Sequence, residues 1–305
     1  MVIDSNHLKN ILEYANCRQI SLPTSIKEQP LVTASVEASY YLDIFHQLQQ
    51  HSKDPYFGLH YGAFLSLKAL AVIYDISLVT ANLKQLFFIW KQYASASFPL
   101  ISFQEEEGLD FYSMQLKRSA VSLSNQVLDS ILMFAYRELK TITNQPITIT
   151  LPYQEVEKYH TWFNTPIIQG TGHALTFHAA SNKIVSNRRQ RHKLSALLPA
   201  FLSYLVPLST QERSFSMRVK VMVLNLCQPD FPTLTKVAAQ FCLTERTLQR
   251  RLKIEGTSFR QILNVLKKEL HSYLKKDPCL KTMELGFILG YSSSSAFLHA
   301  LKSWK

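Results

Sequence analysis

Apolar residues recur at helical spacing in the first part of the chain. In residues 40–51 one face of the expected helix carries Tyr41, Ile44, Phe45 and Leu48. Residues 80–93 show a similar pattern, and Thr80 stands where a residue that caps a helix N-terminus is expected. Both stretches predict amphipathic helices that pack one face against a core.

From residue 100 the pattern changes to the alternation typical of strands. Residues 100–116 alternate on either side of three glutamates and a glycine, which predicts a β-hairpin with Glu105–Glu107 at a solvated tip. Two further alternating stretches, 146–153 and 173–178, predict strands, and residues 124–143 predict a long helix. The first part of the chain is therefore expected to mix helices and strands.

A change in composition at residues 206–214 predicts a domain boundary, because proline, serine, threonine and charged residues gather there. This boundary separates a domain of residues 1–205 from one of residues 213–305. The second domain has short helical patterns and no predicted strand. The predicted fold class is α+β, with a mixed α/β N-terminal domain followed by an all-α C-terminal domain.

Positive charge is concentrated in the last third of the chain. The formal net charge is +11, and residues 206–305 hold 16 Lys and Arg against 7 Asp and Glu, whereas residues 1–205 hold 17 against 15. Such asymmetry indicates a polyanionic partner, either nucleic acid or an anionic membrane. The longest apolar stretches are too short or too interrupted by proline to span a bilayer, so we expect a soluble cytoplasmic protein.

The four cysteines lie far apart, and no Cys or His pair has the spacing of metal ligands. We therefore expect reduced thiols, no metal site and no cofactor. Residues 1–205 also lack a Ser/His/Asp, Cys/His or Glu/His arrangement of recognisable spacing, so no enzyme activity is predicted.

The basic segment from Thr244 to Gly256 predicts a helix with two chemically distinct faces. At 100° per residue, a polar arc of roughly 100° carries Arg246, Gln249, Arg250 and Lys253. Leu248 and Leu252 point to the opposite side. Thr244 is expected to cap the N-terminus, and Gly256 to end the helix.

A shorter apolar pattern in residues 233–242 predicts another helix directly upstream, and the two together predict a helix-turn-helix. In that motif the second helix enters the major groove of double-stranded DNA. Arginine and glutamine pair bidentately with base edges, so we expect base readout by Arg246, Gln249 and Arg250. Further expected DNA contacts, mainly to phosphates, are Thr244, Thr247, Arg251 and Lys253.

The pattern returns in weaker form near the C-terminus. A short helix from Thr282 ends at Gly290, and Ser292 is in position to cap a second helix. The expected DNA contacts of that helix are Ser294, Ser295, His299 and Lys302. A capping box of Ser258 and Gln261 begins the long helix between the two patterns. Its inward residues are expected to be Phe259, Ile262, Leu266, Leu270 and Tyr273, with Lys267 and Lys268 outward. The all-α domain thus has two helix-turn-helix units joined by a linker helix.

Residues 234–263 and 282–304 resemble the DNA-binding domain of the AraC/XylS family of transcription regulators. The resemblance departs from the family at three places: Gly286 replaces a usual alanine, Ser293-Ser294 a common Asp-Pro, and His299 a usual arginine. Residues 54–62, 93–112 and 146–167 resemble the effector-sensing domain, of the arabinose-binding-like type, that precedes many such DNA-binding domains.

The resemblance implies a sequence-specific transcriptional activator in which residues 1–205 sense a small molecule or form a homodimer. The implied partners are double-stranded DNA, a small effector and RNA polymerase, without a membrane, in a cytoplasmic protein associated with the nucleoid. Candidate effector-pocket residues are His60, Tyr61, Tyr74, Trp90, Tyr93, Phe111 and Tyr136. Two alternatives remain: a constitutive DNA binder whose N-terminal domain only dimerises, and a DNA-repair enzyme fused to this DNA-binding domain.

Overall fold

The computed structural model describes residues 1–21, 34–65, 82–119, 123–143, 145–178, 192–193, 195–197, 214–227, 230–278 and 280–304. The chain divides into two compact units, Met1–Asn187 and Arg188–Lys305. The residues at the predicted domain boundary lie outside the described residues except for Ser214, and so does the predicted cap Thr80.

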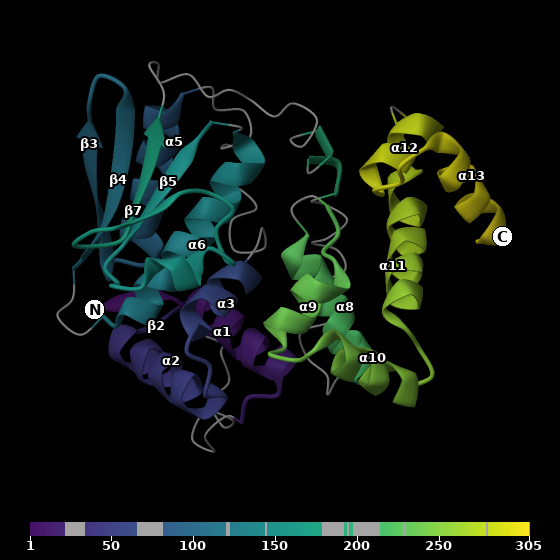
Figure 1. The fold of residues 1–305 in the computed structure, drawn as a ribbon, viewed down its shortest axis with the longest axis horizontal. Coiled ribbons are helices and arrows are strands. Elements are labelled where there is room, and N and C mark those ends of the chain that lie inside the picture. The colour runs from purple at the N-terminus through teal and green to yellow at the C-terminus, as the bar shows by residue number, and fades with distance from the viewer. Residues whose placement is uncertain are drawn as a thin grey trace. The chain divides into compact units, whose positions relative to one another are not determined.

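The first unit combines helices with two sheets, an antiparallel sheet of two strands and a mixed sheet of five strands (Figure 1). Its helices are α1 (Ser5–Arg18), α2 (Ala38–Ser52), α3 (Phe57–Phe64), α5 (Leu83–Ser97), α6 (Asn125–Ile142) and the 3-10 helix η2 (Val156–Tyr159). Its strands are β1 (Val2–Asp4), β2 (Ser35–Glu37), β3 (Ile101–Glu107), β4 (Phe111–Arg118), β5 (Ile147–Leu151), β6 (Ile167–Gln169) and β7 (Ala174–His178). Strands β1 and β2 pair with each other, and the larger sheet has the order β3-β4-β7-β5-β6.

The alternating sequence patterns form the larger sheet as predicted. Strands β3 and β4 make an antiparallel hairpin, and β5 pairs with β7. Alternate residues of β4 and β5 are buried, because α5 and α6 pack against the sheet. The residues Glu105–Glu107 are exposed as predicted, but the prediction that they form the hairpin tip was wrong. These glutamates end strand β3 and pair with β4, and Lys84 and Lys91 on α5 neutralise Glu107 and Glu105.

Helices α3 and α6 approach each other closely through two glycines. A Cβ atom at Gly58 would overlap the backbone oxygen of Gln126, and one at Gly62 would overlap that of Ser130. Glycines four residues apart lie on one face of a helix, so α3 presents bare backbone to α6. This contact fixes the two helices that carry Tyr61 and Ser130.

The second unit is helical throughout its described residues, which confirms the predicted fold class. Its helices are α8 (Phe215–Leu226), α9 (Leu234–Gln240), α10 (Glu245–Ile254), α11 (Phe259–Leu274), α12 (Thr282–Ile288) and α13 (Ser294–Ser303). Helix α8 contacts α9, α10 and α11. Within this unit α11 runs from the α9–α10 pair to the α12–α13 pair (Figure 1).

Candidate nucleic-acid interface and interior cavity

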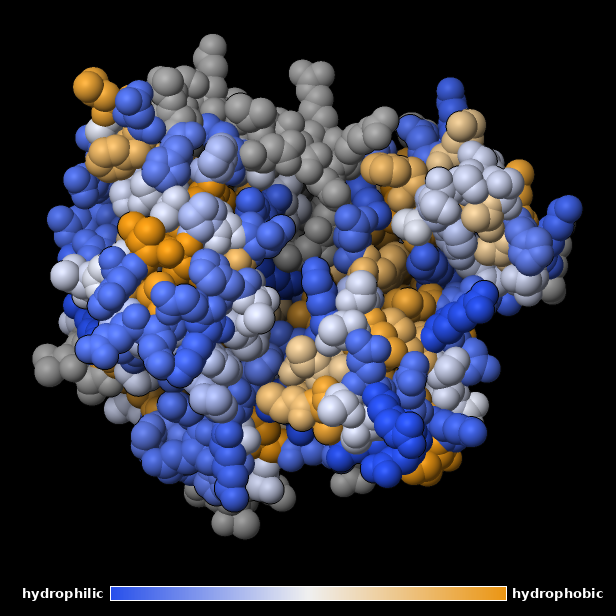
Figure 2. Space-filling view, in the orientation of Figure 1, coloured by the Kyte–Doolittle hydropathy of each residue, from blue (hydrophilic) through white to orange (hydrophobic). Residues whose placement is uncertain are grey.

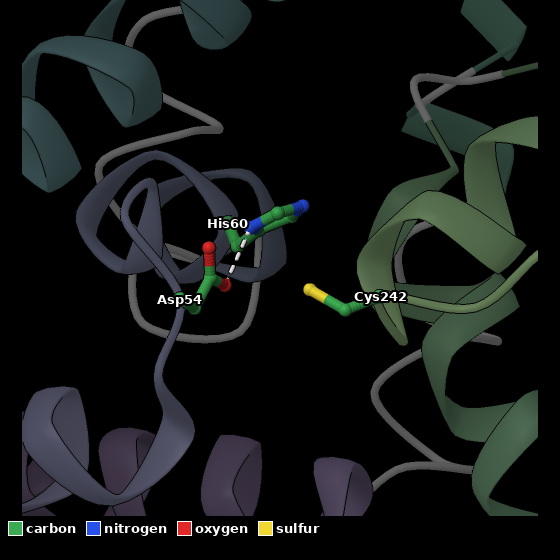
Figure 3. Close-up of side chains that lie close together, drawn as sticks. All are labelled: Asp54, His60 and Cys242. Carbon is green, nitrogen blue, oxygen red and sulfur yellow. Dashed lines mark ion pairs between the residues drawn. The ribbon is translucent and has the colours of Figure 1, made fainter.

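Helices α9 and α10 form a helix-turn-helix joined by a tight turn. The backbone N–H of Leu243 donates to the carbonyl oxygen of Ala238 at 3.0 Å, which folds the chain back over the end of α9. Cys242, one of the residues drawn in Figure 3, takes a left-handed conformation in this turn, with φ of 51°. Val237 and Ala238 are buried, so α9 packs on the apolar face that the sequence predicts.

The ends of α10 are fixed by the residues that the sequence predicts. The hydroxyl oxygen of Thr244 accepts a hydrogen bond from the backbone N–H of Thr247 at 3.2 Å, which caps the helix. Gly256 follows the helix with φ of 70°, a conformation that glycine adopts without strain. The hydroxyl of Thr235 donates to Glu245 at 2.5 Å and thereby ties α9 to the start of α10.

The two faces of α10 differ as its sequence predicts. Leu248 and Leu252 are completely buried. The exposed face carries Arg246, Gln249, Arg250 and Lys253, and none of these four forms an ion pair with another residue that the structure describes. Figure 2 shows strongly hydrophilic side chains gathered over α10. A helix with an uncompensated cationic face is suited to a polyanion.

Arg251 differs from its neighbours because it packs on an aromatic ring. Its guanidinium lies 5.5 Å from the ring centroid of Phe215, and Phe215 in turn contacts the ring of Phe241. Cation–π contacts of this kind stabilise the helix pair against α8. Arg251 therefore has a structural role beside its predicted phosphate contact.

A clamp that the sequence patterns did not reveal joins α10 to α8. The carboxylate of Glu255 accepts hydrogen bonds from the backbone N–H groups of Phe215 and Ser216, at 2.7 and 2.8 Å. These are orphan donors at the N-terminus of α8, where a negative charge is favourable. Burial by itself would raise the pKa of Glu255, but the bonds from Ser216 and Phe215 hold it below its ordinary value.

Replacing Glu255 by alanine is expected to lower the free energy of unfolding of the second unit by about 1 kcal/mol, as for loss of a helix cap. The wild-type contribution is present above the unfolded-state pKa of 4.5 and declines as the pH falls below it. Denaturant titrations at neutral and acidic pH measure both effects. If the substitution lowered the free energy of unfolding equally at both pH values, a role for the ionised carboxylate would be contradicted.

Helix α11 confirms most of its predicted inward face. Ile262, Leu266 and Leu270 are buried, but Tyr273 is exposed and Leu274 is buried in its place. Leu266, Leu270 and Leu274 follow one another at intervals of four residues. The last inward residue is therefore one position beyond the predicted Tyr273. Lys267 was predicted to point outward, yet its ammonium lies 4.4 Å from the ring centroid of Tyr291, and burial lowers its pKa.

Helices α12 and α13 form the second helix pair. Ser293, and not the predicted Ser292, caps α13 by accepting from the N–H of Ala296 at 3.2 Å. Phe297 packs directly over Gly286, and a Cβ at that glycine would lie 3.1 Å from its ring. The indole N–H of Trp304 donates to Asn264 of α11 at 2.9 Å, which holds the end of α13. All four predicted contact residues of this helix are exposed: Ser294, Ser295, His299 and Lys302.

A cavity of about 110 Å³ lies in the first unit, lined by residues of α1, α2, α3, α5, α6 and β3. Tyr61, Trp90 and Tyr93 of the predicted effector-pocket residues line it. Four further polar residues, which no sequence pattern indicated, also line the cavity: His7, Asn10, Ser97 and Ser130. They come from helices far apart in the chain, so no local pattern marks them.

Three other predicted pocket residues that the structure describes do not line this cavity: His60, Phe111 and Tyr136. Tyr136 packs against the ring of Phe163, and Phe111 begins β4 at the hairpin turn. Tyr74 lies outside the described residues. His60 is buried, and its Nδ1 atom lies 2.8 Å from the carboxylate of Asp54, a pairing that Figure 3 shows.

Asp54 is the centre of a buried ionic network. Its Oδ2 atom also lies 2.6 Å from the guanidinium of Arg18, and its Oδ1 atom accepts from the backbone N–H of Tyr56 at 3.0 Å. Burial favours the neutral acid, but the bonds and charges of His60 and Arg18 outweigh it and hold the pKa of Asp54 well below its usual range. The network ties α1 to the start of α3.

The known proteins that this chain resembles include HTH-type transcriptional regulators. The regulator VqsM of Pseudomonas aeruginosa is 28% identical over 161 residues, which are 51% of this chain and 49% of VqsM. The uncharacterized HTH-type transcriptional regulator Rv1395 of Mycobacterium tuberculosis is 40% identical over 74 residues, which are 24% of this chain and 22% of that protein. The matched segments thus span about half of the first relative and less than a quarter of the second.

No family model matches the chain. Among solved structures, the transcriptional regulator CdpR of Pseudomonas aeruginosa aligns over 98% of this chain and 94% of its own with 19% identity and a TM-score of 0.45, a likeness too low to support an argument about function. None of the helices that the structure describes is long and apolar enough to cross a membrane.

Proposed function

We propose that the protein is a sequence-specific, DNA-binding transcriptional regulator of the AraC/XylS type. The observation that carries the proposal is the exposed cationic face of α10, in which Arg246, Gln249 and Arg250 stand free of ion pairs with described residues and opposite a buried leucine face. In a helix-turn-helix this face lies in the major groove. The similarity to helix-turn-helix regulators supports the same function.

The two helix pairs have different proposed roles. Helix α10 offers two arginines and a glutamine, which can pair bidentately with guanine and adenine. The exposed face of α13 offers serines, His299 and Lys302, which make fewer bidentate base contacts. We assign most of the base specificity to α10, and mainly phosphate contacts and positioning to α13.

The first domain, residues 1–205 of the sequence, is proposed to sense a small effector and to form a homodimer. The cavity lined by Tyr61, Trp90 and Tyr93 supports the sensing role. In this scheme the protein is cytoplasmic, associates with the nucleoid and activates transcription through RNA polymerase.

Arg250→Ala tests base readout by α10. We expect binding to the specific site to weaken by about 1–3 kcal/mol, or roughly 5- to 150-fold, with little change on scrambled DNA. Genome-wide mapping of wild-type binding sites supplies the specific site, and fluorescence anisotropy at fixed salt measures both affinities.

Arg260→Ala is the matched control, because Arg260 is also exposed and lies on α11, outside the proposed reading face. It removes the same charge and is expected to weaken binding to the specific and to the scrambled DNA slightly and equally. If Arg250→Ala weakened binding to specific and to scrambled DNA equally, base readout by Arg250 would be contradicted.

A further inference from the structure

The cavity of the first unit has an apolar body. Trp90, Phe98, Phe103 and Phe134 contribute aromatic rings to its wall, and Ile101 and Ile131 contribute aliphatic side chains. None of the described lining residues is Lys, Arg, Asp or Glu. The volume of about 110 Å³ is of the order of cavities that hold a benzene-sized molecule.

Two buried polar side chains, His7 and Ser97, lie at one end of the cavity. Nε2 of His7 is buried and has no hydrogen-bond partner among the residues that the structure describes, and the buried hydroxyl of Ser97 lies beside that of Tyr93. The imidazole of His7 contacts the backbone of Ser97, and its ring lies 4.7 Å from the ring of Phe98, so the two polar side chains belong to the same end. Buried polar groups are usually paired, and an unpaired nitrogen facing a cavity points to a ligand that pairs it.

The charge state of this end limits what it can bind. Burial lowers the pKa of His7 to about 4, although Asp4 and the backbone of Ser97 act in the opposite direction. The imidazole is therefore neutral near pH 7 and provides no cation for a carboxylate. Among the described lining residues an ionised acid would therefore find no cationic partner, and burying an unpaired charge is strongly unfavourable.

We propose that the cavity binds a small uncharged ligand with an apolar, benzene-sized body and one hydroxyl or carbonyl group that hydrogen-bonds to His7 and Ser97. Free carboxylic acids and amino acids are expected to bind this site more weakly than uncharged ligands of the same size. The inference rests on the proposed sensing role of the first domain and adds the place and the chemical class of the effector.

Benzyl alcohol and benzoate are suitable probes because they share a ring and differ in charge. With the full chain at about pH 7.5, benzyl alcohol is expected to bind saturably at one site, and benzoate at least about tenfold more weakly. Titration calorimetry and ligand-observed NMR measure both affinities.

Two alanines of α5 provide a matched pair of variants. Ala94 lines the cavity and Ala96 is exposed on the same helix. Ala94→Leu fills part of the cavity and is expected to abolish binding of benzyl alcohol, whereas Ala96→Leu leaves it unchanged. Circular dichroism checks that both variants fold.

His7→Phe tests the polar end without filling the apolar body. The variant removes an unpaired buried nitrogen and keeps an aromatic ring beside Phe98. It is expected to weaken benzyl alcohol binding several-fold and to leave toluene binding unchanged. The ratio of the two affinities distinguishes a lost hydrogen bond from general damage to the site.

Three results would overturn the inference: no binding of benzyl alcohol, equal binding by Ala94→Leu and wild type, or binding of benzoate as tight as that of the alcohol. Arg250→Ala is expected to bind benzyl alcohol like wild type. Loss of ligand binding with intact DNA recognition would therefore refute this site alone, whereas loss of base readout would refute the DNA-binding proposal alone.

Discussion

Asp54→Ala is expected to lower the free energy of unfolding of the first unit by about 3–5 kcal/mol. The substitution removes the carboxylate that pairs with Arg18 and His60 and leaves a guanidinium buried without that partner. It also removes the oxygen that accepts from the N–H of Tyr56 at the start of α3. A loss of this size is a large part of the stability of an ordinary domain.

Hydrogen exchange read peptide by peptide locates the effect in the full chain. Protection is expected to fall in α1 and α3, because the network joins these two helices. Asp43→Ala is the matched control, since Asp43 is exposed on α2 and forms a hydrogen bond with Gln47 alone among the contacts described for it. Its expected effect is within about 0.5 kcal/mol.

The pH dependence of the Asp54→Ala effect follows from the lowered pKa of the wild-type carboxyl. The stabilisation is present above the unfolded-state value of 3.8. It declines as the pH falls below that value, because the unfolded chain then takes up a proton that the folded carboxylate does not. The difference in free energy of unfolding between wild type and variant should therefore stay constant near neutral pH and become smaller in acid. A gap that grew in acid would contradict this account.

Leu252→Ala is expected to cost about 2–5 kcal/mol of stability in the second unit. Leu252 is completely buried on the back of α10, and its removal leaves a cavity between α10 and the core. Because the exposed arginines depend on this face for their position, specific DNA binding should be lost together with the fold of the helix pair.

Ile254→Ala is the control for Leu252→Ala. It truncates a similar aliphatic side chain on the same helix, but Ile254 is 80% exposed. The control should change stability by no more than about 0.5 kcal/mol. Denaturant titration and hydrogen exchange over α10 measure both variants. Equal stability of the two proteins would show that the apolar back of α10 does not hold the helix.

Local signals explain why α10 was predictable in detail from the sequence. Its cap, its leucine spacing and its terminal glycine lie within thirteen consecutive residues, from Thr244 to Gly256. The predicted cap of α13 is one residue away from the observed one, because Ser292 and Ser293 are chemically equivalent candidates. Only their backbone conformation decides between them.

Other features depend on contacts between distant segments. Helix α8 is buried around most of its surface, so it has no polar face and no periodic pattern to mark it. The cavity combines His7 of α1 with Ser97 of α5, and neither residue is unusual in its own segment. For the same reason the sequence indicated three of the aromatic residues of the cavity but not its polar end.

The separation of packing and charge on α10 has a consequence for how such a protein can diverge. The leucines that hold the helix are buried, and the arginines and glutamine opposite them contribute little to the core. Exposed helix positions tolerate substitution at a cost of only a few tenths of a kcal/mol. Under the proposed base readout by α10, a duplicated copy acquires a new set of target sites by changing three exposed side chains, while its scaffold stays the same.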